Sequence, residues 1–261
     1  MDKQAIEKLV LVLADGLRAD TARFYMGYLA ALEEGGRAHR TQFPCMLPSL
    51  SRPLYATLIT GRAPIEHGVV SNDQPGVSCG ETLFHQLMHA GKRSAAAAYY
   101  FFYELLSGAR YQPYQHRQAA VPAAGLGAAC WYHADEYPDG HTLADGEALR
   151  QQYQPDFLMI HTMGSDHAGH VHGGGSDAYN MAARVLDMQL ALLIPRWHAE
   201  GYHVVLTSDH GMHPDRMHGG TQPVERDVPF YWLPHDRSRP ALPLAQRDVR
   251  AFLARVLLGA G

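Results

Sequence analysis

Residues 9–16 read LVLVLADG, and this stretch decides the fold. Six aliphatic residues in a row are typical of a strand that is buried on both faces, as in the middle of a parallel sheet. Asp15 and Gly16 follow directly and indicate a turn at the carboxyl end of that strand. Mixed charges precede the run, and it ends without a small-residue cleavage site. We therefore interpret it as a first strand and not as a signal peptide.

Further strands and helices alternate along the chain. Strands are expected over residues 93–99, 157–162, 203–208 and 228–233. Helices are expected over about 20–35, 53–60, 81–90, 141–152, 177–200 and 246–258, with Pro195 kinking or ending the fifth. This alternation predicts an α/β fold with a mostly parallel central sheet and helices on both faces. Residues 100–140 show no clear periodicity, and we expect a small insertion there and no second domain.

Composition limits the class of protein. The 261 residues, 46% hydrophobic and 18% charged, predict one globular domain over 1–261. A net charge of −4 argues against a nucleic-acid-binding face, and no apolar run reaches the ~18 residues of a membrane span. Three cysteines without a CxxC pair are typical of a reducing compartment, so we expect a cytoplasmic protein without a membrane partner. The oligomeric state is not predicted.

Acidic and histidine residues follow three of the predicted strands. Asp15 follows the first strand, Asp166 and His170 follow strand 157–162, and Asp209 and His210 follow strand 203–208. Ligands of open parallel sheets bind beyond the carboxyl ends of the strands, so these five side chains are expected at one edge. Carboxylate oxygen combined with imidazole nitrogen suits zinc or manganese better than calcium. The pattern therefore predicts a metal site.

A sixth ligand and a nucleophile are sought near this edge. His218 lies just before Gly219-Gly220 and can return to the edge; His213 is the next candidate should His218 point away. The segment PSLSRP at 48–53 precedes a predicted helix, and Ser51 falls at or near its start. There a helix dipole and a metal ion together lower the pKa of a hydroxyl group. Ser49 is the competing nucleophile, and Cys45 is a third alternative.

The ordered set of motifs resembles the type I phosphodiesterase/nucleotide pyrophosphatase group of the alkaline phosphatase superfamily. The matching stretches are ADG at 14–16, PSLS at 48–51, TLITG at 57–61, DHAGH at 166–170, SDHGM at 208–212, HGG at 218–220 and VP at 228–229. They run in family order over nearly the whole chain. The resemblance implies an alkaline-phosphatase-like three-layer sandwich. It also implies hydrolysis of phosphate esters, in the first place phosphodiester or pyrophosphate bonds, through a phosphoserine intermediate.

The resemblance also implies a two-zinc site. One zinc ion would be held by Asp166, His170 and His218, and the other by Asp15, Asp209 and His210, with Ser51 as nucleophile and minor ligand. Asn72 would donate a hydrogen bond to a phosphate oxygen. Arg52 stands where an aromatic residue is common in the group, and most insertions that recognise nucleotides are missing. At a helix start, the Arg52 side chain is expected on the cleft rim, near a leaving group or second phosphate.

Other functions stay open at this point. A phosphomonoesterase or a phosphomutase-like relative that uses manganese is one alternative. A non-catalytic metal-binding protein on the same fold is another, although the intact ligand set and Ser51 argue against it. Among small-molecule phosphate esters we expect diesters to be preferred, because a monoester dianion brings one more charge to a site whose donor, Asn72, is neutral. Arg52 is the counter-argument, since a guanidinium group can bind a dianion in bidentate fashion.

Overall fold

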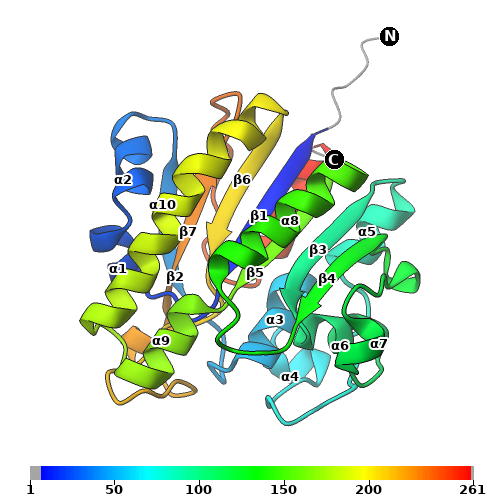
Figure 1. Cartoon of the computed structure of the whole chain (residues 1–261), viewed down its shortest axis with the longest axis horizontal. Helices are drawn as coiled ribbons and strands as arrows, with labels where there is room; N and C mark the ends of the chain where they lie inside the picture. Colours follow the sequence, from blue (N-terminus) through cyan, green and yellow to red (C-terminus); the bar gives the residue numbers. More distant parts are fainter. Residues whose placement is uncertain (1–6, 260–261) are drawn as a thin grey trace.

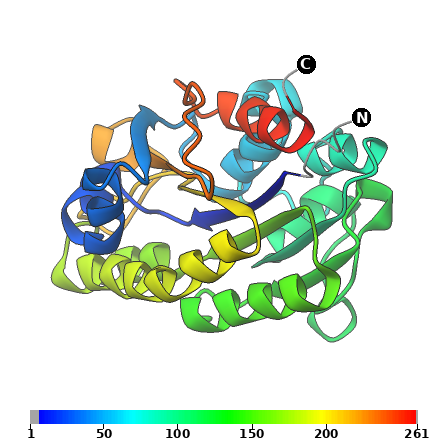
Figure 2. The same ribbon diagram turned by 90° about the horizontal axis from the view of Figure 1, so that it is seen from above.

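The protein consists of one seven-stranded sheet between two layers of helices (Figures 1 and 2). The computed structural model describes residues 7–259. The strands are β1 (Lys8–Ala14), β2 (His39–Pro44), β3 (Ser94–Tyr99), β4 (Ala128–Tyr132), β5 (Phe157–Thr162), β6 (Tyr202–Thr207) and β7 (Asp227–Leu233). Their order across the sheet is β2-β7-β6-β1-β5-β3-β4. β7 runs in the opposite direction to the other six strands. The predicted mostly parallel α/β architecture is confirmed.

β1 is the central strand, and it explains the aliphatic run. It pairs in parallel with β5 on one side and with β6 on the other. Successive side chains of a strand point to opposite faces of the sheet. Leu9, Leu11 and Leu13 accordingly lie in one hydrophobic core, whereas Val10 and Val12 lie in the other. Residues 9–14 of β1 are buried on both faces of the sheet, and none of them is polar.

Each core is closed by its own layer of helices (Figure 2). The leucine side of β1 is covered by α3 (Ser51–Thr60), α5 (Leu83–His89), α6 (Phe101–Ser107) and α12 (Asp248–Leu258). The valine side is covered by α1 (Ala19–Tyr25), α2 (Gly27–Glu34), α8 (Asp139–Tyr153) and α10 (Asp177–Ala199). Five further helices lie in the connections: α4 (Pro64–His67), α7 (Pro113–His116), η1 (Pro122–Ala124), α9 (Gly164–His172) and α11 (Pro223–Arg226).

The structure differs from the sequence-based expectations in local details. The helix expected over 20–35 is two helices, α1 and α2, separated at Met26. α10 does not end at Pro195 but continues to Ala199. No helix within residues 7–259 is both long enough and apolar enough to span a membrane.

Two strands were not expected from the sequence. β2 is an edge strand in which only Phe43 is buried, so it lacks an alternating hydrophobic pattern. β4 lies within residues 100–140, where it forms the other edge and pairs in parallel with β3. This region therefore supplies α6, α7, η1 and an edge strand of the same sheet.

The packing of α10 against the sheet gives a test of the fold. Leu190 is fully buried on the valine side, whereas Leu192 on the same helix is 68% exposed. Leu190→Ala should lower the free energy of unfolding by about 2–5 kcal/mol, because it leaves a cavity in a packed core. Leu192→Ala should change it by less than about 0.5 kcal/mol. Urea denaturation of both variants measures the difference; equal losses would contradict this packing.

Candidate active site

The predicted metal ligands lie together at the carboxyl edge of the sheet. Asp15 directly follows β1, and Asp166 lies in the first turn of α9, which follows β5. Asp209 and His210 come after β6 has ended, so both side chains can turn toward the same side. His170 lies one helical turn beyond Asp166, and its Nε2 atom is 3.4 Å from Asp166 Oδ2. Strand order thus brings together residues that are distant in the sequence.

The ligand atoms form two adjacent groups. In the first, Asp166, His170 and His218 each offer one ligand atom, and these atoms all lie within 4.8 Å of one another. Asp15, Asp166 and His210 form the second group by the same measure. Asp209 adjoins this group, with Oδ2 3.2 Å from His210 Nε2. The sequence assigned Asp166 to one ion only, whereas the structure places this carboxylate in both groups.

The three histidines are oriented by backbone carbonyl groups. Their Nδ1 atoms lie 2.8–2.9 Å from the carbonyl oxygens of Arg216 for His170, Gly211 for His210 and Ser49 for His218. A carbonyl oxygen only accepts, so Nδ1 carries the proton and Nε2 keeps its lone pair. A histidine that ligates a metal usually donates its other N–H in this way. His218 therefore points into the site, and His213 is not needed in its place.

The carboxylates lack partners for their negative charge. Asp15 Oδ1, Asp166 Oδ1 and Asp209 Oδ2 are buried without a hydrogen-bond partner among the described residues. Burial, and then a neighbouring carboxylate, raises the pKa of each of these three groups well above its usual range. Burial also lowers the pKa of His218 to about 4, so this ring is neutral. Neutral imidazoles and unpartnered carboxylates fit divalent cations of the zinc or manganese type.

A second layer of side chains holds Asp15. Asp15 Oδ2 accepts hydrogen bonds from the Tyr55 hydroxyl and from His161 Nε2, the latter at 3.0 Å. Tyr132 donates to His161 Nδ1 at 2.8 Å. No sequence motif indicated Tyr55, although it lies four residues after Ser51 and so on the same helix face. His161 and Tyr132 lie inside strands and have no recognisable sequence signal.

Gly16 permits the close approach of two ligand loops. Its φ is +64°, and a Cβ atom there would lie 2.9 Å from the Cα of Asp166. Its N–H donates to Asp209 Oδ1 at 3.1 Å. Glycine is therefore required for both its conformation and its lack of a side chain.

Ser51 is the serine whose hydroxyl group contacts the ligand cluster. It is the first residue of α3, and its Oγ lies 3.1 Å from His210 Nε2. Ser49 instead donates to the carbonyl oxygen of Gly220 at 2.8 Å and accepts from Gly219 N–H, so it holds the loop that carries His218. Cys45 is fully buried, and burial raises the pKa of its thiol to about 12.

Arg52 does not lie on the cleft rim, and that expectation is wrong. Its side chain points inward, is 1% exposed, and pairs with Glu104 of α6 at 2.7 Å. Its Nε donates to the carbonyl oxygen of Asn72 at 3.0 Å, and its guanidinium carbon lies 3.7 Å from the centre of the Phe101 ring. Burial of a charge requires such a partner. The Asn72 side-chain oxygen accepts from the Arg52 backbone N–H at 2.9 Å, which leaves the amide NH2 as its donor end.

This edge of the sheet can now be compared with known proteins. The model of the type I phosphodiesterase/nucleotide pyrophosphatase family matches residues 9–247. The chain belongs to this family. As a member of this family, whose name states phosphodiesterase and nucleotide pyrophosphatase activity, the protein is an enzyme.

Individual relatives are distant. The catalytic subunit of human GPI ethanolamine phosphate transferase 2 is 24% identical over 268 residues, which cover 96% of this chain and 26% of that protein. The chain thus spans about a quarter of this curated relative. Phosphonoacetate hydrolase from Sinorhizobium meliloti 1021 is similar in fold, with a TM-score of 0.58 and 21% identity over 79% of this chain and 56% of that one. Murine ectonucleotide pyrophosphatase/phosphodiesterase 5 has a TM-score of 0.58 and 18% identity, covering 79% and 58% of the two chains.

The raised carboxyl pKa values predict proton release on metal binding. Without metal, the carboxyl groups of Asp15, Asp166 and Asp209 should hold protons more tightly than ordinary aspartates, because burial and mutual repulsion raise their pKa. Zinc binds only the ionised form, so adding zinc to chelator-treated protein should release protons into a weak buffer with an indicator dye. Asp166→Asn should release fewer protons per chain than the wild type. Equal release by the two proteins would contradict this account.

The buried Arg52–Glu104 pair predicts a large effect on stability. Glu104→Gln removes the negative charge that pairs with Arg52 and leaves the guanidinium group buried without it. This change should lower the free energy of unfolding by about 3–5 kcal/mol. The matched control is Glu33→Gln, which breaks the part-exposed pair with Arg40 and should have an effect of about 1 kcal/mol or less. Chemical denaturation of both variants compares them. Similar losses in the free energy of unfolding of the two variants would contradict this account, in which the burial of Arg52 causes the large effect.

Proposed function

We propose that the protein is a metal-dependent hydrolase that cleaves phosphodiester or pyrophosphate bonds with Ser51 as the nucleophile. The observation that carries this proposal is the position of Ser51 Oγ, 3.1 Å from His210 Nε2, which itself lies 3.4 Å from Asp15 Oδ1 and 3.2 Å from Asp209 Oδ2. Family membership supports the reaction class. The complexes of the murine relative with AMP and of phosphonoacetate hydrolase with phosphonoformate support a small substrate that bears phosphorus.

Two zinc ions are proposed as the resident metals. Asp166, His170 and His218 would hold one ion, and Asp15, Asp209 and His210 the other, with Asp166 adjoining both. When bound, the ions would supply the positive charge that lowers the pKa of a nearby hydroxyl and balances charge on phosphoryl oxygens. Asp15 would be kept in place by Tyr55 and His161.

The residues of the chain suggest a two-step reaction. Ser51 gives up its hydroxyl proton to solvent as Oγ attacks phosphorus; the Oγ–P bond forms as the P–O bond to the leaving group breaks, and the leaving oxygen takes up a proton. Asn72 donates from its side-chain NH2 to a phosphoryl oxygen, because its oxygen is already occupied by the Arg52 backbone. Water then attacks the phosphorylated Ser51, the Oγ–P bond breaks, and a diester substrate leaves as a monoester. The serine hydroxyl is restored.

The buried position of Arg52 favours diesters over monoesters. A monoester dianion needs one more positive group than a diester, and Arg52 was the candidate for it. Its charge is balanced by Glu104, and the side chain is out of contact with solvent. We therefore expect higher kcat/KM for bis-p-nitrophenyl phosphate than for p-nitrophenyl phosphate. A preference for the monoester would place the enzyme with the phosphomonoesterases.

Phosphoryl transfer to an alcohol is the second candidate function. It is favoured by the likeness to GPI ethanolamine phosphate transferases, whose names state the transfer of ethanolamine phosphate. An alcohol hydroxyl would replace water in the second step. Product analysis with and without added glycerol separates the two functions, because a transferase forms the glycerol ester in preference to the hydrolysis product.

Replacement of the nucleophile tests the proposal directly. Ser51→Ala should lower kcat by about 10³-fold or more, since it removes the atom that attacks phosphorus. It should keep nearly all bound zinc, because the remaining ligands come from other residues. Ser49→Ala, which removes only a contact to the Gly219-Gly220 loop, is the matched control and should keep most of the activity. Near-normal activity of Ser51→Ala together with loss in Ser49→Ala would overturn the assignment.

A further inference from the structure

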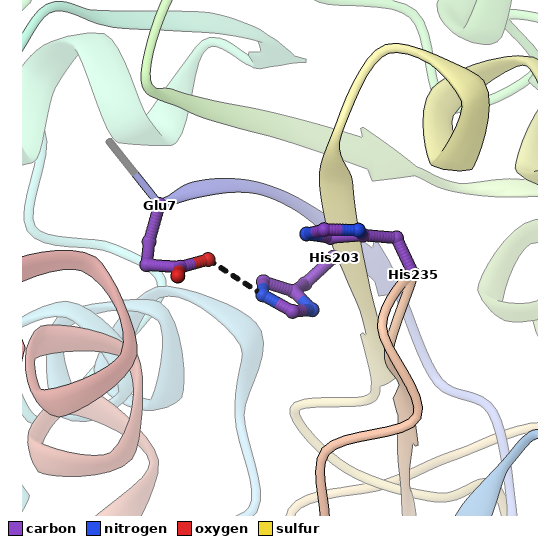
Figure 3. Close-up of side chains that lie close together, drawn as sticks. All are labelled: Glu7, His203 and His235. Carbon is purple, nitrogen blue, oxygen red and sulfur yellow. Dashed lines mark hydrogen bonds and ion pairs between the residues drawn. The ribbon is translucent and has the colours of Figure 1, made fainter. Parts of the chain in front are cut away.

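A second cluster of metal-ligating side chains lies at the amino edge of the sheet (Figure 3). Glu7 precedes β1, His203 is the second residue of β6, and His235 follows the end of β7. Each offers one ligand atom, and these atoms all lie within 4.8 Å of one another. At a rise of about 3.3 Å per strand residue, His203 is about 20 Å from Asp209. The cluster is therefore separate from the candidate active site.

Strand directions bring these three residues together. β1 and β6 are parallel, so their starts coincide, and Leu9 pairs with His203. β7 is antiparallel to β6, so it ends where β6 begins, and Leu233 pairs with Val204. The cluster thus joins a residue from each of three strand ends. No short motif in the sequence indicates it, since the residues lie far apart in the chain.

His203 has an unusual environment for an imidazole. It is 3% exposed and stacks on Trp232, with ring centres 4.7 Å apart. Its Nε2 lies 2.8 Å from Glu7 Oε2, and its ring centre is 4.3 Å from that of the exposed His235. Its Nδ1 is buried and has no hydrogen-bond partner among the described residues; Asp236 Oδ1 lies 3.9 Å away. Nε2 is thus the nitrogen of this ring that faces Glu7 and can share a cation with it.

The charges around the cluster indicate which cation fits. Glu7, His203 and Asp236 line an open cavity of about 470 Å³ together with Arg239 and Arg255. The two arginines balance the two carboxylates, so the cavity has no surplus negative charge to attract calcium or magnesium. Affinity must come from the imidazole nitrogens, which favour zinc and similar ions.

We propose that Glu7, His203 and His235 bind one zinc ion that ties together the starts of β1 and β6 and the end of β7. Nε2 of His203 is the ligand atom beside Glu7. Nδ1 then carries the ring proton on the side of Asp236, whose Oδ1 lies 3.9 Å away. Three protein ligands leave a fourth tetrahedral position for water. This site does not depend on the proposed catalytic function.

Zinc titration of chelator-treated full-length protein tests the site. His235→Ala and Glu7→Gln should each bind one zinc ion fewer per chain than the wild type. His89→Ala, an exposed histidine on α5, is the matched control and should bind the wild-type number. His235→Ala should keep its activity on bis-p-nitrophenyl phosphate within about twofold, given its distance from the carboxyl edge. Equal zinc binding by His235→Ala and the wild type would overturn the proposal.

A second measurement separates this ion from the active-site ions. In an Asp166→Asn background, which weakens both catalytic groups, zinc should still raise Tm, because an ion that binds only the folded protein stabilises it. Adding His235→Ala to that background should abolish the remaining rise. A rise in Tm of the same size with and without His235→Ala would contradict the proposal, whatever the fate of the catalytic activity.

Discussion

Three buried carboxylates that repel one another are the constraint on which this structure depends. Asp15, Asp166 and Asp209 follow three different strands, and the pKa of each is raised first by burial and then by the charge of another of the three. Such an arrangement is unfavourable unless cations or protons balance it. The surrounding contacts serve to keep it together: backbone carbonyls orient the histidines, Tyr55 and His161 hold Asp15, and Gly16 lets two loops approach.

The start of α3 shows how a charge can serve structure instead of substrate binding. Arg52 directly follows the nucleophile candidate, but it is balanced by Glu104 and bonded to the backbone of Asn72. Glu104 also accepts from the backbone N–H groups of Gly76 and Tyr111. α3, α6 and the loop with Asn72 are thereby linked. Ser51 and Asn72 are positioned by this network, and Arg52 leaves the negative charge of the three carboxylates to be balanced by the proposed metal ions.

At both edges of the sheet, the ends of several strands bring possible metal ligands together, but the ligands differ. At the carboxyl edge, loops after β1, β5 and β6 bring carboxylates into contact, and histidines complete the set. At the amino edge, the antiparallel direction of β7 brings His235 to the start of β6, where His203 and Glu7 already lie together. β7 alone among the seven strands runs in this direction. Without this reversal, the end of β7 would lie at the other edge.

Local sequence determined the parts of this protein that depend on periodicity and strand direction. The aliphatic run at residues 9–14 predicted a central strand, and acidic residues after parallel strands predicted a common edge with Asp15, Asp166 and Asp209. These inferences hold because parallel strands all present their carboxyl ends to the same side. The position of Ser51 at a helix start likewise followed from its neighbours in the chain.

Only the tertiary structure decided the contacts between distant segments. Edge strands β2 and β4 lack a hydrophobic pattern or a clear boundary, so pairing with β7 and β3 defines them. The inward direction of Arg52 depends on Glu104, 52 residues later in the chain. The sharing of Asp166 between two ligand groups, and the joining of Glu7, His203 and His235, depend on how strand ends meet in space. Sequence patterns report the environment along one segment, whereas these features arise from the packing of several segments against one another.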